Sequence, residues 1–220
     1  MIAVKFIIVA VISYLLGSLN FGVILSRKLA KEDVRSHGSG NAGSTNMLRN
    51  YGKGMAAFTM AGDMLKVMIA IFIAFLIIPD ADLEKEFINT AFAENSRIIV
   101  KCFAGFFCVL GHIFPCFFNF KGGKGVATSG GMVFMIDWRI ALILLAMFIV
   151  VVAITKYVSL GSLIMAFFYP VLIFAFYQDV VLTLIAVVFA VVVFVAHRSN
   201  IVKLINHNES KITDKKKKDS

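Results

Sequence analysis

Long apolar runs dominate this chain, and they restrict its fold more than any other feature of the sequence. Seven segments can be distinguished, at approximately residues 4–25, 54–78, 98–115, 126–136, 140–155, 158–177 and 180–196. A helix needs about 20 apolar residues to cross the hydrocarbon core of a bilayer, where no water can satisfy the backbone. The fourth segment is shorter than this, and the fifth is marginal. The sequence therefore predicts an all-α integral membrane protein with seven transmembrane helices, some of them short.

The composition supports a membrane protein without a separate soluble domain. Hydrophobic residues make up 60% of the 220 residues and charged residues only 16%, whereas a soluble domain of this length would expose far more charge. No internal repeat is visible. We therefore expect a single transmembrane domain at residues 1–205, followed by a basic cytoplasmic tail at residues 206–220.

The sequence Asp137-Trp138-Arg139 separates the fourth apolar segment from the fifth. Two charges beside an aromatic residue are typical of a membrane–water interface. Because both flanking segments are short, we expect a tight hairpin of two shortened helices.

The basic residues lie in alternate loops, which predicts the orientation of the chain. Lys and Arg are concentrated after the first, third and fifth segments and in the tail, whereas the loop at 79–97 is acidic. If all seven segments cross, the basic loops share one side of the membrane. The positive-inside rule then places the N-terminus outside, the 79–97 loop outside, and the tail with Lys215–Lys218 in the cytoplasm. This pattern explains the net charge of +9 without a nucleic-acid partner.

Residues 36–49 form the first of three polar clusters on the expected cytoplasmic face. Gly38 to Thr45 comes close to a Walker A loop, but Ser44 stands where that motif has its Lys. Glycine lets backbone N–H groups turn toward one anion, and Arg presents a planar fork to phosphate. The polar groups beside the glycines are the hydroxyls of Ser39, Ser44 and Thr45, the amides of Asn41 and Asn46, and the guanidinium of Arg49. The alternative is a flexible loop without a site.

The second cluster places Lys121 and Lys124 around Gly122 and Gly123, at the start of the fourth apolar segment. A helix that begins there would add exposed N–H groups and a dipole favourable to an anion. We therefore predict a second phosphate-binding segment. Ordinary cytoplasmic positive charge is the alternative.

The third cluster, His197 to Asn200, directly follows the last apolar segment. His197 could transfer a proton or donate a hydrogen bond to phosphate, and Asn200 could orient a hydroxyl group. A histidine at a helix end that merely faces the interface is the alternative. We assign this interfacial role to His112, near the end of the third segment.

Two ionisable residues, Asp63 and Lys66, interrupt the second apolar segment. Their spacing puts them on one face of a helix, and such residues usually face the interior of a helix bundle. We expect a structural ion pair.

Taken together, these motifs resemble the bacterial acyl-phosphate:glycerol-3-phosphate acyltransferase family, the PlsY family. The similarity covers nearly the whole chain, and two departures are mild: Ser44 stands where the family commonly has Ala, and Asn20 where it commonly has Pro. The matching segments are Tyr14-Leu15-Leu16-Gly17-Ser18, Gly38-Ser39-Gly40-Asn41 with Thr45-Asn46 and Arg49, Gly111-His112 with Pro115, Lys121-Gly122-Gly123-Lys124-Gly125-Val126-Ala127, and His197-Arg198 with Asn200.

The resemblance implies a seven-span enzyme of the bacterial plasma membrane with a cytoplasmic active site. Residues 1–205 would then be a catalytic domain that transfers a fatty acyl group from acyl phosphate to the sn-1 hydroxyl of glycerol 3-phosphate, giving lysophosphatidic acid. The expected partners are these two substrates, membrane lipid, and the enzyme that produces acyl phosphate. No cofactor and no metal is expected. The implied catalytic residues are Ser39, His197 and Asn200, and the implied phosphate-binding residues are Arg49, Lys124, Gly40, Asn41, Gly122 and Gly123.

The chemistry of the sequence is consistent with this reaction. An acyl phosphate already has a good leaving group, so the enzyme needs to align substrates and stabilise charge. The His-x4-Asp motif of acyltransferases that use thioester donors is absent, because Ala42, Phe117, Val202 and Ile212 stand five positions after the four histidines. The proton acceptor is left open between a side chain and a substrate phosphate. A transporter or binding protein for a phosphorylated metabolite is the alternative function, since phosphate loops at short helices also suit that role.

Overall fold

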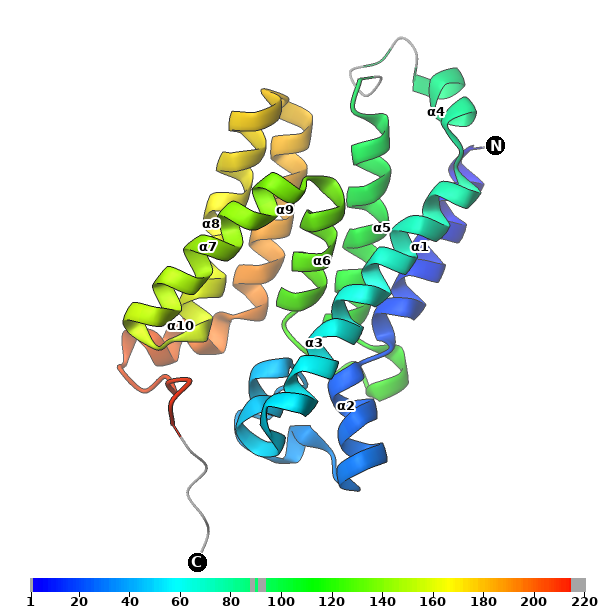
Figure 1. Ribbon diagram of the computed structural model, residues 1–220. Coiled ribbons are helices and arrows are strands. Elements are labelled where there is room, and N and C mark those ends of the chain that lie inside the picture. Colours follow the sequence, from blue (N-terminus) through cyan, green and yellow to red (C-terminus); the bar gives the residue numbers. More distant parts are fainter. Residues whose placement is uncertain (1, 88–89, 91–93, 215–220) are drawn as a thin grey trace, which may run out of the picture.

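A computed structural model describes residues 2–87, 90 and 94–214, and the regular elements in these ranges are all helices (Figure 1). Short turns of π-helix or 3₁₀-helix occupy Ser26–Ala30, Val34–Ser36 and Cys116–Phe118. The α-helices are α1 (Ile2–Ser18), α2 (Phe21–Leu25), α3 (Ser44–Ile77), α4 (Asp80–Phe87), α5 (Ser96–Ile113), α6 (Val126–Ile136), α7 (Trp138–Thr155), α8 (Val158–Tyr177), α9 (Val180–Ala196) and α10 (Arg198–Ile205).

The helices confirm the predicted all-α membrane architecture. In the described part of the chain, five helices are long and apolar enough to cross a bilayer, or six if α9 and α10, which meet at a 63° bend, form one span. Helix α6 has the predicted bounds, but its 11 residues are too few for a regular crossing. The protein is thus a multi-pass membrane protein, and the number of seven crossings stays a prediction.

Helix α3 is longer than the apolar pattern indicates. It begins at Ser44 rather than near residue 54, and Gly52 interrupts it with φ 85° and ψ −178°. Because the residues before this break are mostly polar, the hydrophobic pattern did not predict this part of the helix. The consequence is that the end of the first polar cluster, including Arg49, lies on a helix and not in a loop.

The predicted tight turn between α6 and α7 is present, but only α6 is a shortened helix, because the 18 residues of α7 are long enough to cross a bilayer. Asp137 alone separates the two helices, and its carboxylate accepts a hydrogen bond from the backbone N–H of Arg139 at 2.9 Å. The Arg139 guanidinium (2.7 Å) and the Tyr177 hydroxyl (3.1 Å) also donate to this carboxylate. These bonds, those of Arg139 above all, lower the pKa of Asp137 to about 2.

Helices α1 and α5 pack so closely that their backbones touch. A Cβ atom on Gly17 would overlap the Cys108 carbonyl, and one on Gly111 would overlap the Tyr14 carbonyl. The Tyr14 hydroxyl then donates to the Phe114 carbonyl at 2.7 Å. This crossing fixes the point at which the chain leaves α5 and enters the second glycine-rich segment.

The predicted ion pair is buried between α3, α1 and α5. Lys66 Nζ lies 2.8 Å from Asp63 Oδ1 and donates at 3.0 Å to the Leu19 carbonyl, where α1 ends. His112 completes the group, with Nδ1 2.9 Å from Lys66 Nζ. Because His112 is only 3% exposed, its predicted interfacial position is wrong.

The polar clusters lie at one end of the bundle. In Figure 1, α2, α10 and the start of α3 are at this end, whereas α4 and the start of α1 are at the other. The acidic helix α4 is thus separated from the basic segments, as the charge pattern predicts. Which end faces the cytoplasm stays a prediction, and Lys215–Lys218 lie outside the described residues.

The buried ion pair leads to a prediction about stability. Asp63→Leu leaves the Lys66 ammonium buried without its counter-charge, so it should destabilise the protein by roughly 3–5 kcal/mol. The double variant with Lys66→Met should recover most of this loss. Thermal unfolding in detergent would measure both.

Asp80→Leu is the matched control, because the Asp80 carboxylate pairs with Arg97 at 3.1 Å but is 52% exposed. It should cost about 1 kcal/mol or less. Equal losses for Asp63→Leu and Asp80→Leu would show that the buried pair has no special structural role.

Candidate functional site

The first glycine-rich loop folds around the side chain of Asn46, which is 2% exposed. Its amide NH₂ donates to the carbonyls of Val34 (3.0 Å), His37 (3.0 Å) and Asn41 (2.8 Å). Its oxygen accepts from the Ser39 N–H at 3.1 Å. Asn46 therefore organises the loop from inside and does not contribute a free amide to a site.

Two glycines in this loop have left-handed backbone conformations, with φ +57° at Gly38 and +70° at Gly40. A Cβ on Gly38 would also collide with the Asn46 oxygen. The Gly40 N–H donates to the His37 carbonyl at 3.1 Å, so it closes a turn. Ser39 stands between these glycines and is exposed.

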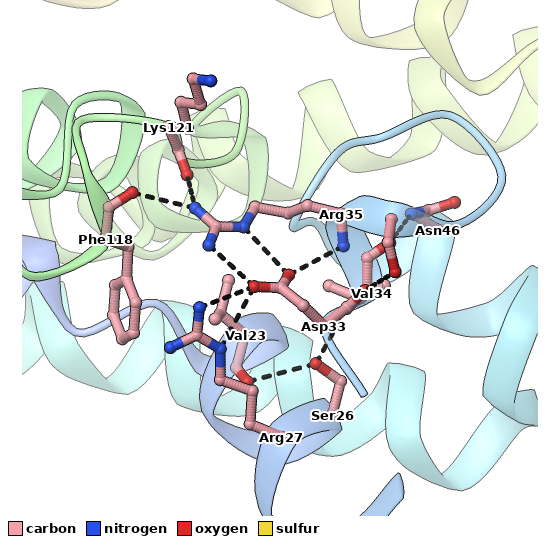
Figure 2. Close-up of polar contacts among 10 residues, drawn as sticks. Val23, Ser26, Arg27, Asp33, Val34, Arg35, Asn46, Phe118 and Lys121 are labelled. Atoms are coloured by element: carbon pink, nitrogen blue, oxygen red, sulfur yellow. Dashed lines mark hydrogen bonds and ion pairs between the residues drawn. The ribbon is translucent and has the colours of Figure 1, made fainter. Parts of the chain in front are cut away.

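An arginine–carboxylate network joins this loop to the second glycine-rich segment (Figure 2). Asp33 accepts hydrogen bonds from Arg27 and Arg35, each at 2.8 Å, and the bonds from Arg35 are the main reason why the pKa of its carboxyl falls well below its usual range. The same Arg35 guanidinium donates to the carbonyls of Phe118 (2.9 Å) and Lys121 (2.7 Å). Arg35 thus connects two loops that are more than 80 residues apart.

Gly122 and Gly123 pack against the end of α5. Their N–H groups, which we predicted to face phosphate, donate instead to the carbonyls of Ile113 and His112, both at 3.1 Å. A Cβ on Gly122 would meet the His112 carbonyl, and one on Gly123 would meet the His112 ring. These glycines permit the close approach that brings Lys124 beside α5.

Lys124 connects the second segment to the third. Its ammonium donates to the Asn200 side-chain oxygen, and the Asn200 NH₂ donates to Glu209 Oε1 at 2.8 Å. Burial lowers the pKa of Lys124 to about 8, an effect that the Glu209 carboxylate partly opposes. Lys124 therefore loses its charge more readily than an exposed lysine.

His197 forms the corner between α9 and α10 and is 2% exposed. Its Nδ1 lies 2.8 Å from the Val193 carbonyl. A carbonyl can only accept, so Nδ1 carries the hydrogen and Nε2 has none in the neutral ring. The Asn200 N–H donates to the His197 carbonyl at 2.8 Å, which fixes Asn200 one turn beyond this corner.

A cavity of about 370 Å³ lies where the three clusters meet. One wall is apolar and comes from the ends of α5 and α9, with Leu110, Ile113, Val191 and Val195 among its residues. The rest of the lining includes Arg198, Ser199 and Lys203 and six predicted site residues: Ser39, Gly40, Asn41, Gly123, Lys124 and Asn200. Such a cavity suits a molecule with an anionic head and an apolar chain.

The other three predicted site residues do not line this cavity. Gly122 packs under it and His197 lies at the helix corner, whereas the Arg49 guanidinium donates to the carbonyls of Ser210 (3.0 Å) and Lys211 (3.2 Å). Sequence reasoning missed Arg35 and Glu209, and it placed Asn46 in the site rather than beneath it. An Asn within a glycine-rich segment is a signal for a side chain that organises a turn. The partners of Arg35 at Phe118 and Lys121, and that of Glu209 at Ser159, are too distant in sequence to leave such a signal.

The role of Asn46 can be tested by hydrogen exchange. Asn46→Ala removes the donor to three carbonyls and the acceptor for the Ser39 N–H, so amide exchange over residues 34–43 should accelerate about tenfold or more. Thr45→Ala is the control, because the Thr45 hydroxyl makes no hydrogen bond to the described residues. Unchanged exchange in Asn46→Ala would mean that the loop is held by other contacts.

Comparison with known proteins agrees with the geometry. The family model for glycerol-3-phosphate acyltransferase matches residues 7–207. The chain is 39% identical to the glycerol-3-phosphate acyltransferase of Clostridioides difficile (strain 630), over 96% of this chain and 98% of that one. It is also 39% identical to the enzyme of the same name from Brucella anthropi, over 92% and 90% of the two chains.

Two crystal structures of PlsY, described as an integral membrane glycerol 3-phosphate acyltransferase, have the same fold. The glycerol 3-phosphate form has a TM-score of 0.79 at 32% identity, and the lysophosphatidic acid form 0.76 at 30%. Each match covers 94% of both chains. The chain therefore belongs to the glycerol-3-phosphate acyltransferase family of integral membrane proteins.

Proposed function

We propose that this protein transfers a fatty acyl group from acyl phosphate to the sn-1 hydroxyl of glycerol 3-phosphate, a step of phospholipid synthesis. The hydroxyl oxygen bonds to the acyl carbon as the acyl–phosphate bond breaks, and the products are lysophosphatidic acid and inorganic phosphate. The observation that carries this proposal is the cavity, whose lining combines Lys124, Asn200 and Ser39 with apolar residues of α5 and α9. Membership of the family supports the choice of acceptor.

The choice of acyl phosphate as donor rests on the residues of the cavity and on the absence of a thioester-acyltransferase motif. An acyl phosphate is a mixed anhydride, so no covalent enzyme intermediate is needed, and alignment with charge stabilisation is sufficient. Lys124 supplies a buried positive charge for a phosphate, while the apolar wall can receive the start of a fatty acyl chain. The absent His-x4-Asp motif argues against thioester donors.

We assign roles to the remaining site residues from their positions. Lys124 binds a phosphate group, and Ser39 and Asn200 contact the reacting groups, because all three line the cavity. Arg49 does not line it, and its phosphate-binding role rests on the family resemblance. The His197 side chain does not line the cavity. His197 therefore acts by positioning Asn200, whose backbone N–H donates to the His197 carbonyl. The hydroxyl proton then passes to a phosphate oxygen of a substrate. Gly40, Asn41, Gly122 and Gly123 shape the loops that place these groups.

We further propose that the site faces the cytoplasm of a bacterial plasma membrane, with the N-terminus outside and the 206–220 tail inside. The support is the collection of basic segments at one end of the bundle, away from the acidic helix α4. In this orientation the enzyme that makes acyl phosphate can deliver its product directly to the cavity.

The donor prediction can be tested with purified protein in detergent. Supplied with glycerol 3-phosphate, the protein should form lysophosphatidic acid from palmitoyl phosphate and show little or no turnover with palmitoyl-CoA. Mass spectrometry would identify the product. Equal or faster turnover with palmitoyl-CoA, in an assay free of phosphate, would contradict the proposed donor.

The pKa of Lys124 predicts a dependence on pH. Because this pKa is lowered to about 8, the ammonium loses its charge as the pH rises through 8, and kcat/KM should fall above that pH. In Lys124→Arg the charge persists at high pH, so the falling limb should move to higher pH even if the rate is lower.

Lys121→Arg is the matched control for this pH profile, because Lys121 lies in the same loop but its side chain does not line the cavity. The falling limb should remain near pH 8 in this variant. A Lys124→Arg profile that coincides with that of the unmodified protein would exclude Lys124 as the group responsible.

A further inference from the structure

A buried polar group lies next to the candidate site and has no part in the reaction proposed above. It consists of Asp63 and Lys66 on α3 and His112 on α5, and all three side chains are buried. Lys66 Nζ has three partners: Asp63 Oδ1 at 2.8 Å, the Leu19 carbonyl at 3.0 Å and His112 Nδ1 at 2.9 Å. An ammonium has three N–H donors, so these contacts use all of them and hold Lys66 in one position.

The same contacts hold the His112 ring. Because an ammonium can only donate, Nδ1 accepts from Lys66, and the neutral ring carries its hydrogen on Nε2. The Asp63 carboxylate lies farther from Nδ1, at 3.4 Å. The Nε2 edge is therefore the side of the ring that does not take part in the ion pair.

This Nε2 edge meets Gly123, which lines the cavity. A Cβ atom on Gly123 would lie 2.0 Å from Nε2, and its three nearest neighbours would all be atoms of the His112 ring. The Gly123 N–H also donates to the His112 carbonyl at 3.1 Å. His112 thus contacts the backbone of Gly123 at two points, with its ring and with its carbonyl.

The His112 carbonyl has a second buried donor. Asn20, at the break between α1 and α2, donates to it from Nδ2 at 3.3 Å, and Asn20 is fully buried. The ring of His112 is therefore held from α3 and its carbonyl from α1. A shift of His112 would break hydrogen bonds to both helices.

We propose that His112 is a positioning residue for Lys124, the phosphate-binding residue that directly follows Gly123. This inference rests on the proposed function. With Gly123 held against the ring, the chain leaves α5 in one direction, and the Lys124 ammonium lies beside Asn200 in the cavity lining. Asp63 and Lys66 act through His112, because they hold its ring and neither lines the cavity. Such support matters because a misplacement of about 1 Å can cost about 100-fold in rate.

Two substitutions of His112 separate the two edges of its ring. In His112→Asn the side-chain amide ends where Nδ1 was, so it can accept from Lys66 but leaves a gap beside Gly123. In His112→Gln the amide reaches as far as Nε2, so it can fill the space against Gly123 but gives up the acceptor at Nδ1.

The test measures kcat/KM with palmitoyl phosphate and glycerol 3-phosphate, and thermal unfolding in detergent. His112→Asn should lower kcat/KM about tenfold or more and unfold close to the temperature of the unmodified protein. His112→Gln should unfold at a lower temperature and keep kcat/KM within about threefold. A merely structural role would rank the two variants in the same order by activity and by stability. A kcat/KM in His112→Asn that is not at least about threefold below that in His112→Gln would overturn the positioning role.

Gly123→Ala decides the question if His112→Gln does not fold. Its Cβ would overlap the Nε2 edge, so kcat/KM should fall in this variant. Asn lacks that edge, so the double variant with His112→Asn should be about as active as His112→Asn alone. Losses that multiply in the double variant would contradict the proposal.

Amide hydrogen exchange tests the same claim without turnover. Exchange over residues 121–125 should be at least about threefold faster in His112→Asn than in His112→Gln. Cys102→Ala is the control, because it alters a buried side chain of the same helix, and it should change exchange in this segment and kcat/KM by no more than about twofold. If the unmodified protein forms no lysophosphatidic acid, the proposed function fails and exchange alone decides. Equal exchange in the two His112 variants would then refute the positioning of this loop by His112.

Discussion

The Arg35 guanidinium is the interaction on which the candidate site most depends. It pairs with Asp33, just before the first glycine-rich loop, and donates to the Phe118 and Lys121 carbonyls at the edge of the second. Guanidinium–carboxylate pairs with several bonds are geometrically specific, so this contact sets the distance between the two loops. Ser39 and Lys124 enter the same cavity because that distance is set.

The bilayer explains why polar residues are either paired inside the bundle or located at its ends. A polar group in hydrocarbon must find its partners within the protein, and the buried residues Asp63, Lys66 and His112 find them in one another. Other polar groups, with Lys124 and Asn200 among them, are gathered around the cavity at one end of the bundle. A cavity that joins this end to the apolar ends of α5 and α9 can receive a lipid-like donor and a water-soluble acceptor together.

The sequence predicts the helices better than it predicts the site. Apolar runs bounded by polar residues determined the ends of α6, α8 and α9, whereas α3 extends through polar residues to Ser44 and was predicted too short. Most of the predicted site residues line the cavity. The hydrogen bonds of Arg35 to the Phe118 and Lys121 carbonyls, and that of Ser159 to Glu209, depend on contacts between distant segments. Local sequence patterns do not predict such contacts.

The central claim is that three distant segments form one phosphate-binding site, and a structure with bound glycerol 3-phosphate tests it most directly. The account predicts that the phosphate lies within hydrogen-bond distance of both Arg49 and Lys124. A phosphate bound elsewhere, for example against Lys121 and away from Arg49 and Lys124, would contradict it.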